Sequence, residues 1–159
     1  MNISVVLPVL NEEQSIRGTL QSLIRLTPYE IIVVDGGSRD RTLEICKEFA
    51  VDVMHAERGR ARQMNVGARR ASGEVLLFLH ADTRLPQSAL NDIAAALSDS
   101  RYLGGRFDVE LEGEHWMLVE AETAGAFAKS DSEERPNPIL AFHKAVTAMG
   151  TLGRVLSGQ

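Results

Sequence analysis

Residues 30–40 read EIIVVDGGSRD, and this stretch decides the fold class of the chain. Residues 31–34 are all apolar and β-branched, which is typical of a strand buried on both faces of a sheet. Asp35 and the two glycines after it stop the apolar run, as turn residues do. A helix is predicted to begin near Asp40, with Cys46 facing inward. The stretch therefore predicts a strand, a polar turn and a helix in succession.

The same succession recurs on both sides of this stretch. Further buried strands are predicted over residues 3–7, 51–55 and 75–79, further helices over residues 11–24, 61–71 and 87–98, and a half-exposed strand over residues 106–111. Asn11 is predicted to be the N-cap of the first helix, with Gln14 as its capping-box partner. Strands that alternate with helices predict an α/β fold, with a mostly parallel sheet that carries helices on both faces.

The chain changes character near residue 113. Residues 1–113 carry the alternating pattern and are predicted to form one domain. The remainder, residues 114–159, is predicted to hold a weak helix over 114–128, a charged loop with two prolines over 129–138 and a last helix over 139–156. This divergent helical segment is either part of the same domain or the truncated beginning of another part.

The composition excludes several classes of protein. A length of 159 residues fits one domain, and a net charge of −5 excludes binding to nucleic acid through a basic surface. The single cysteine permits no disulfide within the chain, which favours an intracellular, cytoplasmic setting. The N-terminus lacks a basic leader, and no apolar stretch is long enough to cross a bilayer. Peripheral contact with a membrane and pairing into a homo-oligomer are left open.

Three polar loops follow predicted strands, at residues 11–13, 35–40 and 80–83. Because ligands of such sheets bind beyond the carboxyl ends of the strands, these loops are expected to meet at one edge. In the first loop, the carboxylates of Glu12 and Glu13 could contact a base or a ribose. The alternative is that they are favourable charges in the first turn of a helix.

The loop that begins at Asp35 also has two interpretations. The carboxylate could accept a hydrogen bond from a base N–H or a ribose hydroxyl, while Gly36 and Gly37 let a ligand approach the backbone closely. The alternative is a tight turn in which Asp35 and Asp40 cap the next helix. Taken alone, the motif favours the turn slightly.

The segment His80-Ala81-Asp82 follows the most apolar predicted strand. Asp82 could bind Mg²⁺ or Mn²⁺, which prefer oxygen ligands, and His80 could be a second ligand or a phosphate contact. The alternative is a capped turn before Pro86, with His80 packed at the end of the strand.

Three arginines, Arg58, Arg60 and Arg62, precede or open a predicted helix, with Asn65 further along it. A helix N-terminus favours anions, and arginine binds phosphate through paired hydrogen bonds. Phosphate binding and a solvated basic face are about equally supported for these arginines.

Taken in order, these segments resemble family 2 glycosyltransferases of the GT-A fold, a Rossmann-like fold that binds nucleotide sugars. The matching segments are residues 5–13, 30–40, 61–67 and 73–82, within a region of resemblance that covers about residues 1–112. The motif at residues 80–82 also resembles that of a bacterial subgroup, which has His-Ala-Asp in place of Asp-x-Asp.

The resemblance implies a donor-binding role for each matching position. The loop from Pro8 to Glu12 would line the nucleoside pocket, and Asp35 would contact the base beside Gly37. Arg62 and Asn65 would lie near the ribose or the phosphates.

The resemblance also implies a metal centre. Asp82 would hold a divalent cation, Mn²⁺ or Mg²⁺, on the diphosphate of the donor. His80 replaces the first aspartate of the usual motif, so the metal has one carboxylate ligand fewer.

The predicted function is the metal-dependent, inverting transfer of a sugar from a nucleoside diphosphate sugar, of the UDP or GDP type, to an unknown acceptor. Such a reaction needs a general base, and Glu120, Glu122 and Asp131 are available carboxylates that no motif assigns to this role. The alternative is a catalytically incomplete nucleotide-sugar-binding module that lacks the acceptor half. A nucleotidyltransferase ranks last, because residues 8–11 are not a glycine-rich phosphate loop.

Overall fold

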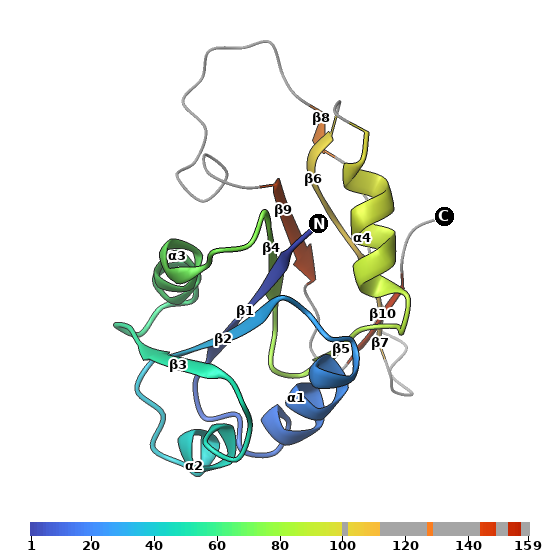
Figure 1. Ribbon diagram of the computed structural model, residues 1–159. Coiled ribbons are helices and arrows are strands. Elements are labelled where there is room, and N and C mark those ends of the chain that lie inside the picture. Colours follow the sequence, from blue (N-terminus) through green and yellow to red (C-terminus); the bar gives the residue numbers. More distant parts are fainter. Residues whose placement is uncertain (100–101, 112–126, 129–143, 149–152, 157–159) are drawn as a thin grey trace.

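The computed structural model describes residues 1–99, 102–111, 127–128, 144–148 and 153–156 (Figure 1). In chain order, the elements are β1 (Ile3–Val9), α1 (Ile16–Arg25), β2 (Glu30–Asp35), α2 (Thr42–Cys46), β3 (Asp52–His55), α3 (Arg60–Arg70), β4 (Val75–Leu79), β5 (Thr83–Arg84), α4 (Ala89–Leu97), β6 (Tyr102–Arg106), β7 (Asp108–Leu111), β8 (Phe127–Ala128), β9 (Lys144–Ala148) and β10 (Gly153–Leu156). Strands and helices alternate through the first half of the chain, which confirms the predicted α/β fold.

The main sheet has the strand order β3-β2-β1-β4-β9-β6-β8 among the described residues. β1 pairs in parallel with β2 on one side and with β4 on the other. The pairs β2–β3, β4–β9 and β6–β9 are also parallel, whereas β6 and β8 are antiparallel. A smaller sheet has the order β5-β10-β7. The main sheet is therefore mostly parallel, as predicted.

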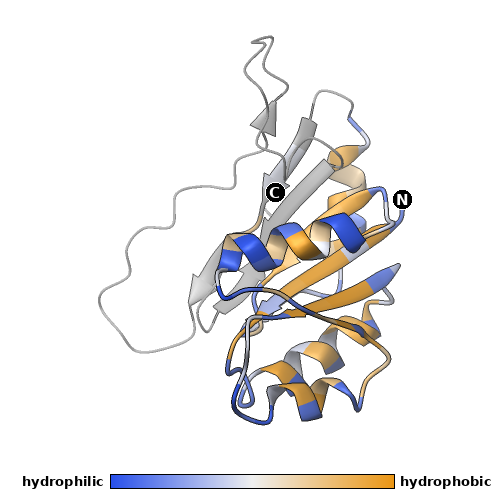
Figure 2. Ribbon diagram, turned by 90° about the vertical axis from the view of Figure 1, so that its left-hand side faces the viewer, coloured by the Kyte–Doolittle hydropathy of each residue, from blue (hydrophilic) through white to orange (hydrophobic). Residues whose placement is uncertain are grey.

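Both faces of the main sheet are covered by helices. Successive side chains of a strand point to opposite faces. On one face, Val5 and Leu7 of β1 belong to a core cluster with residues of α1, α2 and α4, such as Leu20. On the other face, Val6 belongs to a second cluster, against which Met64 of α3 packs. Figure 2 shows the apolar strands between the helices of the two faces. This burial on both sides explains why the strand sequences are continuously apolar.

The elements predicted within residues 3–98 occur within a few residues of their predicted places. Cys46 is fully buried in α2, as predicted, and is a free cysteine. Burial, with a smaller contribution from the negative charge of Asp35, raises the pKa of its thiol to about 11. The thiol is therefore a neutral part of the core.

The predicted helix cap at Asn11 is wrong. α1 begins at Ile16, after Ser15, so the capping box with Gln14 does not form. Asn11 has a φ of 58°, in the left-handed region that asparagine tolerates better than most residues. Its Oδ1 accepts a hydrogen bond from the backbone N–H of Arg39 at 2.8 Å. A contact with a distant loop has taken the place of the local cap.

The helix predicted over residues 139–156 is also wrong where the structure describes it. β9 and β10 lie within this range and are strands. β9 pairs with the edge of β4 that faces away from β1. The backbone groups on that edge need partners when they are buried, and Val146 and Thr147 have high strand propensity. Tertiary pairing therefore overrides the helical spacing of the apolar residues.

The strand predicted over residues 106–111 is interrupted at Phe107, which is buried. β6 ends before this residue in the main sheet, and β7 begins after it in the smaller sheet. The single predicted strand is therefore two strands of different sheets.

Residues 112–126 and 129–143 lie outside the described residues, so most of the weak helix predicted over 114–128 and the charged loop predicted over 129–138 stay predictions. The last two residues of that helix, Phe127 and Ala128, form β8 instead, so the helix prediction is wrong at this end. The division of the chain at residue 113 also stays a prediction, although β9, from beyond this point, pairs with β4. Within the described ranges, no helix combines the length and the apolar character that a membrane span requires.

A cluster of hydrogen bonds joins the amino ends of the central strands. The Ser4 hydroxyl donates to Glu30 Oε1 at 2.6 Å and accepts a bond from the Gly73 N–H at 2.9 Å. The N–H and the hydroxyl of Ser72 donate to the same carboxylate oxygen at 2.7 and 3.0 Å. Burial acts to raise the pKa of Glu30, but these hydrogen bonds outweigh it and lower the pKa.

α3 approaches the sheet closely at Gly67. A Cβ atom at this position would lie 2.3 Å from Cγ1 of Val6 and 3.1 Å from Cγ2 of Val34. These distances leave no room for any other residue at this point of the helix. Gly18 of α1 is the opposite case, because a Cβ atom there would have nothing within 4 Å.

Gly67→Ala is expected to lower the free energy of unfolding by about 1–3 kcal/mol, because the new methyl group overlaps Val6 in a packed core. Gly18→Ala is the matched control and should raise stability by up to about 1 kcal/mol, since alanine favours a helix and the space is open. Urea denaturation followed by circular dichroism measures both. Equal stability of the two variants would contradict the close packing at Gly67.

Glu30 is expected to contribute a pH-dependent part of the stability. Its pKa is lowered in the folded state, so its contribution is present above its unfolded pKa, about 4.3, and is lost as the pH falls through the lower folded value. Glu30→Gln should therefore show a smaller loss of stability than the wild type between about pH 5 and pH 3. Denaturation midpoints measured across this range would contradict the prediction if the two proteins lost stability in parallel.

Candidate functional site

β1 separates from β4 at its carboxyl end. It pairs with β2 as far as Val9, but with β4 only as far as Val6. The Val75 N–H donates to the carbonyl of Asn2, so even-numbered residues of β1 turn their backbone groups toward β4. Pro8 is an even-numbered residue and has no N–H, which ends this ladder. The predicted loop residue Pro8 therefore lies within β1 and opens the sheet between β1 and β4.

A pocket of about 700 Å³ lies beyond this opening. It is lined by Asn11, Glu12, Glu13, Gln14, Ser15, Gly18, Thr19, Asp40, Asp82 and Arg84. The chain runs from β1 to β2 on one side, while β4 lies on the other, so the opening is a topological switch point of the sheet. Ligands of open α/β sheets bind at such points. The structure thus brings Glu12 and Asp82, predicted from separate loops, into one pocket.

A smaller pocket of about 330 Å³ lies beside the loop after β2. It is lined by Leu10, Asn11, Gly36, Gly37, Arg39 and Arg58. Gly37 has a φ of 96°, a conformation that strongly favours glycine. Asn11 lines both pockets, so the two are neighbours, and the smaller one adds two guanidinium groups to the site.

Asp35 shapes the wall of the smaller pocket from behind. It is only 1% exposed. Its carboxylate accepts bonds from the N–H groups of Gly37 at 2.9 Å and Ser38 at 3.1 Å, and lies 3.4 Å from Nδ1 of His55. These contacts are the ones expected if Asp35 closes a tight turn, which is the alternative interpretation of this loop. Direct contact between Asp35 and a base stays a prediction.

The loops after β1 and β2 are joined by reciprocal hydrogen bonds. The Asn11 N–H donates to Ser38 Oγ at 2.9 Å, in addition to the bond that Asn11 Oδ1 accepts from Arg39. The Glu12 N–H donates to Thr42 Oγ1 at 2.7 Å. The two loops therefore form one wall that both pockets share.

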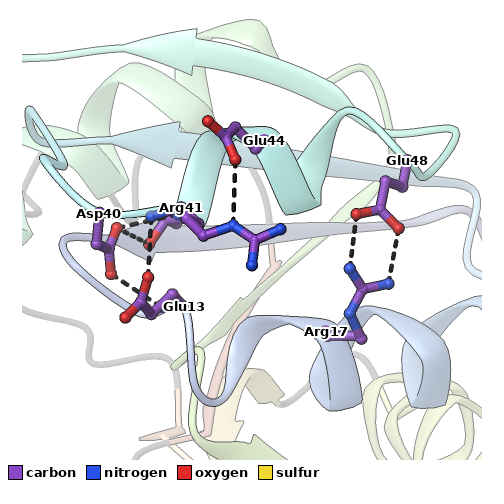
Figure 3. Close-up of polar contacts among 7 residues, drawn as sticks. Glu13, Arg17, Asp40, Arg41, Glu44 and Glu48 are labelled. Carbon is purple, nitrogen blue, oxygen red and sulfur yellow. Dashed lines mark hydrogen bonds and ion pairs between the residues drawn. The ribbon is translucent and has the colours of Figure 1, made fainter.

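Glu13 and Asp40 belong to the same set of contacts (Figure 3). The Glu13 N–H donates to Asp40 Oδ2 at 3.0 Å, and the Arg41 N–H donates to Glu13 Oε2 at 3.1 Å. Burial acts to raise the pKa of Asp40, but bonds from Thr42 and Glu13 outweigh it and lower the pKa. The same view shows the exposed Arg17–Glu48 pair, which joins α1 to the residues that follow α2.

The loop after β4 is attached to α1. The buried Thr19 hydroxyl donates to the carbonyl of Ala81, next to Asp82. His80 is half-buried at the end of β4. Burial and the positive charge of Arg60 lower the pKa of His80, while Asp82 opposes them. The imidazole is therefore neutral at pH 7, the form that can bind a metal.

The other predicted donor residues lie on α3 and line neither of these two pockets. Arg62 is exposed and forms an ion pair with Glu57. Asn65 is half-buried. Their predicted position near a ribose or phosphates stays a prediction, as does the contact of His80 with the donor.

Sequence reasoning missed Gln63, between these positions. Its side chain is 4% exposed, and Nε2 donates to the carbonyls of Val9 and Val34, both at 2.8 Å. A glutamine within a helix gives no sequence signal for such contacts, because both partners are distant in the chain.

A sequence model of glycosyl transferase family 2 matches residues 4–152. The chain belongs to this family. The predicted recognition is therefore confirmed at the level of the family, although the match extends beyond residue 112, where the predicted resemblance ended. The subgroup with the His-Ala-Asp motif stays a prediction.

Two relatives illustrate the similarity. An undecaprenyl-phosphate 4-deoxy-4-formamido-L-arabinose transferase of Pectobacterium atrosepticum is 37% identical in an alignment over 98 residues, and the alignment covers 54% of this chain and 30% of that protein. The poly(ribitol-phosphate) beta-N-acetylglucosaminyltransferase TarS of Staphylococcus aureus is 32% identical in an alignment over 110 residues, and the alignment covers 62% of this chain and 19% of that protein. The match thus spans less than a third of the length of either relative.

Solved structures confirm the GT-A fold. TarS of S. aureus, residues 1–349, has a TM-score of 0.63 and 28% identity over 72% of this chain and 38% of that one. Glucosyl-3-phosphoglycerate synthase of Mycobacterium tuberculosis, crystallised with Mn²⁺ and UDP-glucose, has a TM-score of 0.59 and 25% identity over 67% of this chain and 43% of that one.

Asp35→Ala is expected to lower the free energy of unfolding by about 1–2 kcal/mol, because the N–H groups of Gly37 and Ser38 lose a charged acceptor. Asp35→Asn keeps one acceptor oxygen and should lose less. Urea denaturation of the three proteins measures the difference. If Asp35→Ala were as stable as the wild type, the role of Asp35 in the turn would be wrong.

Proposed function

We propose that this chain binds a nucleoside diphosphate sugar, of the UDP or GDP type, together with a divalent cation. The protein that contains it transfers the sugar to an acceptor with inversion at the anomeric carbon. Membership of family 2 supports glycosyl transfer as the class of reaction. The pockets at the switch point of the sheet support this edge as the donor site.

The proposal rests on one observation, which is that the Asp82 carboxylate accepts a weaker hydrogen bond than the other carboxylates of the larger pocket. Glu12, Glu13 and Asp40 each accept a hydrogen bond of 3.1 Å or shorter from the surrounding protein. Asp82 is bonded to the hydroxyl of its neighbour Thr83 at 3.4 Å, the weak limit of a hydrogen bond. The Asp82 carboxylate therefore keeps lone pairs that can bind a cation.

The residues present fit Mg²⁺ or Mn²⁺. In the part of the chain that the structure describes, no group of three or more His, Cys, Asp or Glu side chains could hold a metal ion. Mg²⁺ usually keeps several waters and is held by one or two carboxylates and by the phosphates of the substrate. Asp82 would hold the cation, with neutral His80 beside it. The cation would supply positive charge against the diphosphate leaving group.

The chain's own residues would bind and orient the donor. The nucleoside would lie against Gly37, which is exposed and whose lack of a side chain leaves the backbone accessible. Arg39 and Arg58 line the same smaller pocket that would hold the nucleoside, and they would extend positive charge toward the phosphates. Asn11, at the junction of the two pockets, would lie between the nucleoside and the phosphates.

The proposed transfer also requires an acceptor and a general base. Glu120, Glu122 and Asp131 lie outside the described residues. The Pectobacterium relative is named for transfer involving undecaprenyl phosphate, which makes a lipid phosphate one acceptor class to test. A cytoplasmic location with peripheral membrane contact and a homo-oligomeric state stay predictions.

The alternative function is nucleotide-sugar binding without transfer. Slow hydrolysis of the bound donor, or transfer to any acceptor, would favour the enzyme, whereas binding without chemistry would favour the binding module.

Calorimetric titration tests the donor site. UDP, GDP and their glucose or mannose conjugates would be titrated with Mn²⁺, with Mg²⁺ or with EDTA. We expect one nucleotide to bind only with metal, and Asp82→Ala to weaken its Kd at least about tenfold, which is ~1.4 kcal/mol. Glu44→Ala, which removes an exposed carboxylate outside both pockets, is the control and should bind normally.

Two results would count against the proposal. If the wild type bound none of these nucleotides in the presence of metal, the proposed donor site would be wrong. If Asp82→Ala and the wild type bound the nucleotide with equal Kd, the assignment of Asp82 as the metal ligand would be wrong, but nucleotide binding itself would stand.

A further inference from the structure

The side chain of Gln63 joins the ends of two neighbouring strands. Its Nε2 atom carries two hydrogens, and it donates to the carbonyls of both Val9 and Val34. The Val9 carbonyl also accepts a ladder bond from the Gly36 N–H at 3.0 Å. Val9 is the last residue of β1, and Val34 is the last but one of β2. The amide therefore connects β1 and β2 where their loops leave the sheet.

Gly36 fits closely against this amide. A Cβ atom on Gly36 would lie 3.0 Å from both Cδ and Oε1 of Gln63. Gly36 also lines the smaller pocket, together with Gly37 and Asn11. The buried amide thus supports, from inside the protein, the wall that a ligand of this pocket would touch from outside.

A polar side chain in this position is not needed for packing alone. Met64 and Val66 of α3 already pack against the apolar cluster on this face of the sheet. Burial of an amide is unfavourable unless its hydrogen bonds are made, and here both N–H groups have partners. The specific effect of Gln63 is therefore on the backbone at the two strand ends.

We propose that Gln63 is a positioning residue, which holds the loops after β1 and β2 in the geometry that forms the smaller pocket. Its consequence for nucleotide affinity rests on the proposed function. The positioning itself does not, because it can be measured on the protein without a ligand.

The test compares Gln63→Leu with Ser4→Ala. Gln63→Leu keeps an apolar body of similar size and removes both N–H donors at the carboxyl ends of the strands. Ser4→Ala removes a buried bridging side chain at the amino ends of the same sheet, far from both pockets. A purely structural loss would therefore affect the two variants alike.

Amide hydrogen exchange is the first readout. In Gln63→Leu, exchange of the Asn11, Gly36 and Gly37 amides should rise at least about tenfold relative to the strand interiors, since their loops lose a fixed support. Ser4→Ala should leave these three amides unchanged. A uniform rise across the sheet, or the same pattern in both variants, would overturn the proposal.

Nucleotide affinity is the second readout. Titration with UDP or GDP and Mn²⁺ should show Kd at least about tenfold weaker for Gln63→Leu and unchanged for Ser4→Ala, because a displaced wall weakens binding. Equal affinity of the two variants would overturn the link to the pocket. If the wild type binds neither nucleotide, the proposed function fails, and the exchange data alone decide whether Gln63 positions the loops.

Gly36→Ala is a second variant that tests the same proposal if Gln63→Leu does not fold. Its methyl group would lie 3.0 Å from the Gln63 side chain, so the intact amide would have to shift by a few tenths of an ångström relative to the strand ends. The same localised rise in exchange is expected. Wild-type exchange at Asn11 and Gly37 in this variant would overturn the proposal.

Discussion

The close contact between α3 and the sheet at Gly67 is the constraint on which the rest of the site depends. Because Gly67 has no Cβ atom, the helix backbone can approach Val6 at a distance that any other residue would prevent. Gln63 lies one turn earlier on the same face of the helix. The short distance between helix and sheet lets its amide reach the carbonyls of Val9 and Val34. A packing contact in the core therefore sets the geometry of two strand ends.

The opposite face of the sheet fixes the other wall of the site. Thr19, buried in α1, bonds the carbonyl of Ala81, so the loop that carries Asp82 is attached to a core helix. Between the two walls, Pro8 ends the pairing of β1 with β4. The pocket thus follows from the absence of one N–H at the centre of the sheet and from a helix on each face. Sites built on such rigid elements are more precisely positioned than sites on free loops.

The sequence was sufficient for the inner strands and for the convergence of the loops. Parallel strands buried on both faces are continuously apolar, and their loops must leave from one edge, so Glu12 and Asp82 could be placed together. It was insufficient where distant residues decide a conformation. Asn11 adopts a left-handed backbone conformation, and its side chain accepts a hydrogen bond from the backbone N–H of Arg39. A capping rule considers neighbours in the sequence and does not include this distant partner. Gln63 is an ordinary helical residue until the fold places two carbonyls, 29 and 54 residues away, beside it.

At the outer edge of β4, a segment that is distant in the sequence also decides the conformation. The apolar residues of 139–156 have helical spacing, yet residues 144–148 form β9 and pair with β4. This pairing leaves β4 flanked by strands on both sides, and β4 is the strand that leads into Asp82. At its carboxyl end, where the pairing with β1 has stopped at Phe78, β4 still pairs with β9 through Leu79. A segment beyond residue 113 therefore helps to fix a site residue that the sequence motifs assign to the first 113 residues alone.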